Sequence, residues 1–150
     1  MDIKSAEDRS KNMSRIRCKK TKPEMFVRSL LFRKGFRYRV NYSMVVGSPD
    51  IYFSKKKIAI FINGCFWHRH QNCKYAYTPK SNIEFWNAKF IANQKRDELV
   101  RSQLLTHGIR VLVVWECTVK RMMSDPLVCD VKSAEILMDI GEENQKYIEL

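Results

Sequence analysis

Two unbroken apolar runs limit the folds that this chain of 150 residues can adopt. The first is Ile58-Ala59-Ile60-Phe61-Ile62 and the second is Val111-Leu112-Val113-Val114-Trp115. A strand with one face in water alternates apolar and polar side chains, whereas a strand covered on both faces is apolar throughout. We therefore predict two buried strands at the centre of a sheet, with helices covering the sheet.

Two segments carry the start signals of helices. Residues 21–24 (Thr-Lys-Pro-Glu) have capping-box spacing with an early proline, and Gly35 gives a stop signal. Residues 81–84 (Ser-Asn-Ile-Glu) have the same spacing and predict a long helix to about Thr106. A short final helix is expected around residues 133–140, followed by a polar tail.

The remaining pattern predicts one α/β domain over residues 21–150, with a central mixed sheet flanked by helices. Shorter strands are expected at residues 38–42 and 50–53, and the chain has no internal repeat or linker-like stretch. Residues 1–20 are polar and basic and are expected to form an arm. A frayed terminus and an arm that grips DNA both fit this composition.

The charge balance favours a polyanionic partner. The chain has 28 Lys and Arg against 16 Asp and Glu, which gives a net charge of +12. An anionic membrane surface is the competing partner, but no segment resembles a basic amphipathic anchor and no apolar run has the length of a membrane span. We therefore expect a nucleic-acid-binding protein without membrane contact. No targeting signal follows Met1.

Three of the five cysteines fall into a pattern typical of a metal site. Cys65, His70 and Cys73 share one loop, and Cys117 ends a strand that could run beside the first apolar strand. Three thiolates and one imidazole are the ligands of tetrahedral structural zinc, although buried free cysteines are a common alternative. The odd cysteine count and the missing export signal make a disulfide framework unlikely, so Cys18 and Cys129 are expected to be ordinary thiols.

Three further side chains are candidates for catalysis. If four protein ligands close the zinc shell, the zinc orders its loop and His68 is left free as a general base. A solvent-exposed histidine or an alternative zinc ligand is the competing interpretation of His68. Asp50 follows Pro49 at the mouth of a strand, where it could hold Mg²⁺ or serve as a turn-forming residue. Glu24 could supply a second carboxylate, and position N3 of the capping box explains it equally well.

Six segments occur in a familiar order between residues 9 and 120 and together resemble the very-short-patch repair (Vsr) endonucleases. They are residues 9–13 (Arg-Ser-Lys-Asn-Met), 21–24 (Thr-Lys-Pro-Glu), 47–50 (Gly-Ser-Pro-Asp), 63–68 (Asn-Gly-Cys-Phe-Trp-His), 84–86 (Glu-Phe-Trp) and 113–117 (Val-Val-Trp-Glu-Cys). A linked series of this kind is far more specific than any single motif.

The resemblance implies a restriction-endonuclease-like fold, related to PD-(D/E)xK nucleases whose second acidic residue and lysine are replaced. It also implies a nick in one strand of duplex DNA, 5′ of the thymine in a T:G mismatch left by deamination of 5-methylcytosine. A bacterial cytoplasmic monomer is the implied state, with mismatch-repair factors as partners that engage the terminal arm.

Site residues can be carried over where the motifs match. The resemblance implies that Asp50 and the backbone carbonyl of Ile62 bind Mg²⁺, and that His68 activates the attacking water. Glu24 matches an acidic position near the site. The implied zinc ligands are Cys65, His70, Cys73 and Cys117, and the implied aromatic wedge that opens the duplex consists of Phe66, Trp67 and Trp86.

Asn63 departs from the family pattern, because many members have a histidine at this position in the catalytic centre. Asparagine cannot exchange a proton at neutral pH, although it can hydrogen-bond a phosphate oxygen. We therefore expect slower cleavage, by the ~10²–10⁴-fold typical of one lost acid or base. Asn63 also supports an alternative function, that of a cleavage-deficient, zinc-stabilised DNA-binding protein. A separate alternative is an enzyme with catalytic zinc, which would need an open coordination position.

Overall fold

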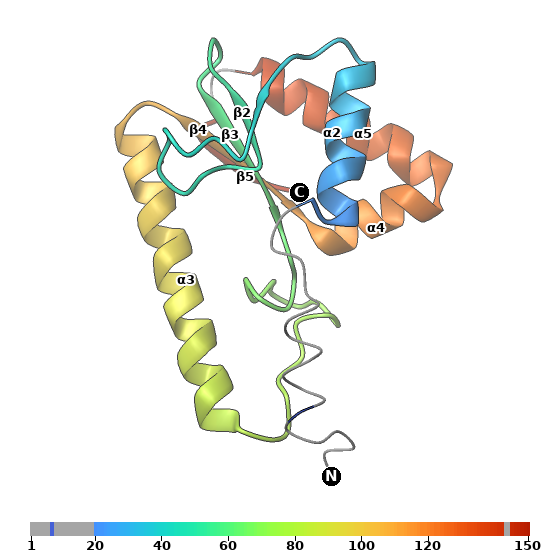
Figure 1. Ribbon diagram of the computed structural model, residues 1–150. Helices are drawn as coiled ribbons and strands as arrows, with labels where there is room; N and C mark the ends of the chain where they lie inside the picture. The colour runs from blue at the N-terminus through green and yellow to red at the C-terminus, as the bar shows by residue number, and fades with distance from the viewer. Residues whose placement is uncertain (1–6, 8–19, 143–144) are drawn as a thin grey trace.

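A computed structural model describes residue 7, residues 20–142 and residues 145–150. Most of the arm expected over residues 1–20 therefore lies outside the described residues. The described chain forms one mixed sheet with helices against it, as the sequence predicts (Figure 1). Its relation to PD-(D/E)xK nucleases stays a prediction.

The sheet has the strand order β1-β2-β3-β4-β5. The strands are β1 (Arg39–Val40), β2 (Ile51–Phe53), β3 (Ile58–Asn63), β4 (Arg110–Trp115) and β5 (Tyr147–Glu149). The first two pairings are antiparallel, and β3–β4 and β4–β5 are parallel. The two apolar runs are therefore adjacent central strands, which confirms the main expectation about the fold.

Side chains of the central strands alternate between two covered faces. Ile60, Ile62 and Val114 pack on one face with α2 (Lys22–Arg33), α4 (Glu116–Ser124) and α5 (Pro126–Gly141). Ala59, Val111 and Val113 pack on the other face, where α3 (Ile83–Thr106) lies (Figure 1). Burial on both faces explains why these strands carry almost no polar side chains.

Helix α2 begins as predicted, and α3 begins differently. Thr21 caps α2 by accepting a hydrogen bond from the Glu24 amide at 3.4 Å. The N-cap of α3 is Asn82 in the left-handed conformation (φ 51°), and its side chain makes no capping bond. Asparagine tolerates that conformation, and α3 therefore begins one residue later than the predicted capping box at residues 81–84 requires.

The C-terminal part was predicted incompletely. Two helices, α4 and α5, replace the short helix expected at residues 133–140, and they meet at Asp125-Pro126. The Asp125 side chain accepts hydrogen bonds from Leu127 and Val128, and Pro126 lacks the amide that a continuing helix would need. The expected polar tail instead forms β5 beside β4.

Helix α5 and its caps are acidic, unlike the rest of the chain. The segment contains five carboxylates and one lysine: Asp125, Asp130, Lys132, Glu135, Asp139 and Glu142. Its buried residues pack on the sheet face opposite α3. Among the described helices, none is long and apolar enough to cross a membrane.

Candidate active site and metal centre

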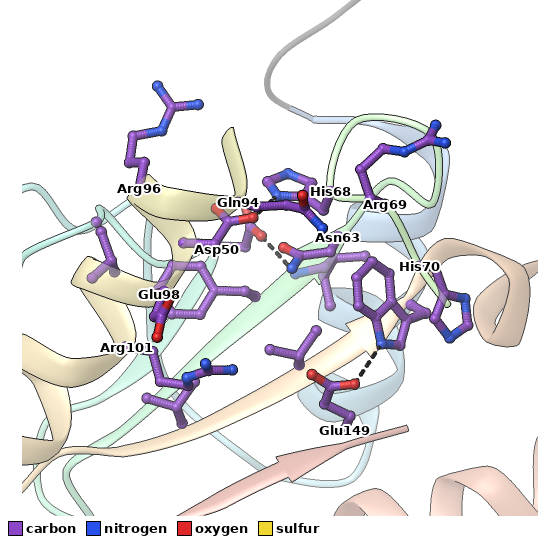
Figure 2. Close-up of a pocket in the computed structure, with 18 of the residues that line it drawn as sticks. Asp50, Asn63, His68, Arg69, His70, Gln94, Arg96, Glu98, Arg101 and Glu149 are labelled. Carbon is purple, nitrogen blue, oxygen red and sulfur yellow. Dashed lines mark hydrogen bonds and ion pairs between the residues drawn. The ribbon is translucent and has the colours of Figure 1, made fainter. Parts of the chain in front are cut away.

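A cavity of about 1230 Å³ opens between α3 and the sheet, and it collects the predicted catalytic positions (Figure 2). Glu24, Asp50, Asn63 and His68 all line it, although they come from α2, the start of β2, the end of β3 and the following loop. The structure therefore brings the four candidates together, as their assignment to one site requires.

Asp50 is held beside the end of β3. Its Oδ2 accepts a hydrogen bond from the Ile62 amide at 2.7 Å (Figure 2). Burial raises the pKa of Asp50 to about 6, while the Ile62 hydrogen bond opposes this change and the Glu24 carboxylate adds to it. Asp50 is thus a partly buried carboxylate whose negative charge is poorly compensated by the protein alone, a suitable environment for a cation.

The raised pKa predicts a stability effect with a definite sign. The folded protein binds the Asp50 proton more tightly than the unfolded chain does. The stability that this tighter proton binding contributes is therefore fully present below pH 4 and is lost as the pH rises through about 6. In magnesium-free buffer at pH 7.5, we expect Asp50→Asn to raise the free energy of unfolding by about 1–2 kcal/mol. Urea unfolding at pH 7.5 and pH 4 tests this, and a gain of equal size at both values would contradict it.

Glu24 is almost fully buried, with 3% of its surface exposed. Its carboxylate accepts the Lys20 amide at 2.9 Å and lies 3.4 Å from the Arg28 guanidinium, which also donates to the Asp50 carbonyl. The backbone amide of Glu24 therefore belongs to the helix cap, while its carboxylate forms part of the cavity wall. The two interpretations of Glu24 do not exclude each other.

His68 has a carboxylate partner that the sequence analysis missed. Its Nδ1 lies 2.6 Å from Oδ2 of Asp97, on α3. This contact fixes the ring and leaves Nε2 for a hydrogen bond in the cavity. Asp97 is about two turns from the buried residues Phe90 and Leu104, seven positions from each. A carboxylate on the inward stripe of an otherwise surface helix was the available signal.

The predicted zinc ligands also meet. The ligand atoms of Cys65, His70, Cys73 and Cys117 all lie within 4.8 Å of one another and could hold one metal ion. The parallel pairing of Asn63 with Trp115 explains the meeting, because Cys65 and Cys117 each follow these partners by two residues. The Glu116 carboxylate accepts the Cys65 amide, and the His70 ring stacks on Trp115 with centroids 4.2 Å apart.

Comparisons with known proteins identify the family of this chain. A family model described as DNA mismatch endonuclease Vsr matches residues 1–74. The type II nicking enzyme V.NmeAIP of Neisseria meningitidis is 44% identical over 138 residues, which cover 89% of this chain and 98% of that relative. The chain belongs to the Vsr family.

Other relatives extend the family likeness. The DNA mismatch endonuclease Vsr of Escherichia coli is 38% identical over 119 residues, covering 79% of this chain and 76% of that protein. The type II nicking enzyme V.XorIIP of Xanthomonas oryzae is 41% identical over 116 residues, covering 77% of this chain and 85% of the enzyme. By name, these three relatives are one DNA mismatch endonuclease and two type II nicking enzymes.

The aromatic residues assigned to a wedge form one cluster in this Vsr family member. The Phe66 ring contacts those of Trp67 at 5.0 Å, Trp86 at 5.5 Å and Phe90 at 5.2 Å, all nearly edge to face. Phe90 is buried, whereas the other three rings are partly exposed. Asn93 donates to the Trp67 carbonyl at 3.1 Å and so connects α3 to the loop of residues 65–73, which carries three of the candidate metal ligands.

Proposed function

We propose that this Vsr family member is a Mg²⁺-dependent endonuclease that nicks one DNA strand 5′ of the thymine in a T:G mismatch, the lesion left by deaminated 5-methylcytosine. The observation that carries the proposal is the placement of Asp50 and the His68–Asp97 pair in one cavity, next to a partly exposed aromatic cluster. Neither Asp50 nor His68 would be needed merely to bind DNA.

Asp50 and the backbone carbonyl of Ile62 would hold Mg²⁺, which when bound neutralises charge on the phosphodiester. The fit rests on the poorly compensated Asp50 carboxylate, whose second oxygen remains available after Oδ2 has accepted the Ile62 amide. His68 then takes the proton of the attacking water at Nε2, while Asp97 holds Nδ1 and stabilises the imidazolium that forms. Glu24 reinforces the negative potential at Asp50.

The four-ligand cluster suits structural zinc. Ideal tetrahedral zinc bonds place a sulfur and a nitrogen ligand roughly 3.5 Å apart. His70 Nδ1 lies 3.6 Å from the Cys65 sulfur and 3.4 Å from the Cys117 sulfur. With Cys73 as the fourth ligand, no coordination position is left for water, which argues against catalytic zinc.

Asn63 lines the cavity. Many members of the Vsr family have a histidine at this position. The Asn63 amide can hydrogen-bond a phosphate oxygen but cannot protonate the leaving group, so cleavage should be slow rather than absent. Phe66, Trp67 and Trp86 would enter the stack next to the mismatch, where unstacking costs less than in paired DNA. We further propose a monomer in the bacterial cytoplasm that hands its nick to mismatch-repair factors.

The deciding experiment compares duplexes that contain T:G or C:G in a methyltransferase-type site, with each strand labelled separately. Magnesium should be omitted rather than chelated in the control, because a chelator would also remove zinc. We expect magnesium-dependent cleavage beside the mismatched thymine alone. Mismatch binding without cleavage would instead favour the cleavage-deficient DNA-binding protein, and Asn63→His would then be the substitution to restore activity.

The His68–Asp97 contact predicts a separable kinetic effect. Asp97→Asn should lower the single-turnover nicking rate by roughly 10²-fold, because it removes the charge that stabilises the imidazolium, and should leave the Kd for T:G DNA unchanged. The matched control is Glu98→Gln on the next residue of α3, which should keep the wild-type rate. If weaker binding of T:G DNA accounted for the whole loss of nicking rate in Asp97→Asn, Asp97 would only support the fold.

A further inference from the structure

The loop between the metal cluster and α3 carries an exposed aromatic ring that the proposed wedge does not include. Tyr77 is 64% exposed, yet its ring lies 5.1 Å from the ring of Phe66. Phe66 in turn contacts Trp67 and Trp86. Tyr77 is therefore one exposed end of a continuous aromatic surface, and Phe85, which is 57% exposed and contacts Trp86, is another.

Arg69 holds this loop in place. Its guanidinium donates to the Tyr77 carbonyl at 3.0 Å and to the Thr78 hydroxyl at 3.1 Å, and it lies over the Phe90 ring at 4.0 Å. These contacts join the 77–78 backbone to the metal-binding loop and to α3. An exposed tyrosine with a fixed backbone loses little conformational entropy when it binds a flat partner.

The charge of the loop indicates what kind of partner this is. Residues 74–82 contain Lys74 and Lys80, both exposed, and no acidic residue. Phosphates bind lysines, and every nucleobase has a face on which an aromatic ring can stack. An aromatic residue with a lysine three positions away on each side in the sequence, next to rings assigned to the duplex, fits a nucleobase and its neighbouring phosphates.

We propose that Tyr77 is a further DNA-contacting residue, whose ring stacks on a nucleobase next to the step opened by Phe66 and Trp67. The inference rests on the proposed function, because it needs DNA over the aromatic surface. It extends the contact by one base beyond the three-residue wedge, and it gives Arg69 the role of positioning residue. The competing role for Tyr77 is to cover Phe66 without contacting DNA.

Three substitutions of Tyr77 in the full chain separate these roles. Phenylalanine keeps a flat ring, leucine keeps apolar cover without a ring, and alanine removes both. The probe is a T:G duplex with 2-aminopurine placed in turn at each step beside the mismatch, without magnesium. We expect Tyr77→Ala and Tyr77→Leu to bind about 10-fold more weakly and to change the fluorescence at one of these positions, and Tyr77→Phe to match the wild type.

The matched control is Tyr75→Ala in the same loop. The Tyr75 ring lies beside Lys74 and Lys120 instead of the aromatic cluster, so its loss should leave affinity and fluorescence unchanged. Wild-type affinity in Tyr77→Leu, or in all three variants, would overturn the proposal. If Tyr77→Ala loses bound metal or thermal stability, the DNA affinities of Tyr77→Leu and Tyr77→Phe decide whether the ring contacts DNA. A wild-type protein that does not prefer T:G over C:G would instead count against the proposed function.

Discussion

Replacement of Asp50 by alanine should abolish nicking of a T:G duplex and leave binding of the same duplex intact. Asp50 is the carboxylate that would hold Mg²⁺, and its loss should cost several kcal/mol of transition-state stabilisation, or roughly 10³-fold or more in rate. Affinity should stay equal or rise slightly, because a negative charge is removed next to phosphates. Single-turnover nicking with strand-labelled DNA gives the rate, and fluorescence anisotropy without magnesium gives the Kd.

The Glu98→Gln variant serves as control here as well, because Glu98 is an acidic residue that lines the same cavity. It should nick at the wild-type rate if Asp50 acts as a specific ligand rather than as part of a general negative potential. Equal losses of nicking and binding in Asp50→Ala would count against a metal-ligand role, since they would show damage to the DNA-binding surface.

Replacement of Cys73 by serine should remove the bound zinc and much of the stability of the fold. Cys65, His70 and Cys73 hold a loop of nine residues, and Cys117 ties that loop to the start of α4. A structural zinc site contributes its binding free energy to folding. A loss of several kcal/mol would lower the Tm by roughly 10 °C or more in a chain of this size.

Zinc content and Tm should be measured together for Cys73→Ser, with Cys129→Ser as the matched control. Cys129 lies on α5, with its sulfur 3.7 Å from the Ser133 hydroxyl, and takes no part in the cluster. The control should keep one equivalent of zinc and the wild-type Tm. Wild-type protein purified without zinc, together with an unchanged Tm in Cys73→Ser, would refute the structural-zinc proposal. Because His68 lies inside the loop, the same variant should also lose nicking.

The sequence predicted the centre of the molecule well, because burial on both faces leaves a clear apolar signal. Once Ile58–Asn63 and Arg110–Trp115 are placed as neighbours, the meeting of Cys65 with Cys117 follows from strand ends alone. The edge strand β5 carries no such signal, because it is only three residues long and is partly exposed. The position of β5 depends on backbone hydrogen bonds to β4, and these bonds can form with many different side chains.

The sequence predicted individual residues of the candidate site but not the contacts between them. Motif residues such as Asp50 and His68 stand out by chemical type, whereas Asp97 resembles any charged residue of a surface helix. Its contact with His68 becomes visible when the 24-residue helix α3 is packed directly against the loop that carries His68. The break between α4 and α5 was missed for a related reason, because a capping aspartate before proline is a local signal that an apolar periodicity hides.

The acidic helix α5 has a consequence for how DNA reaches the cavity. A duplex that approaches α5 meets carboxylates, whereas a duplex that approaches the 74–82 loop meets lysines. Such a field rotates the protein during diffusion, so that a larger share of collisions begins with the cavity toward the phosphates. If the protein acts on DNA as proposed, the acidic helix would discourage encounters in the wrong orientation, and we expect added salt to remove this guidance and slow association.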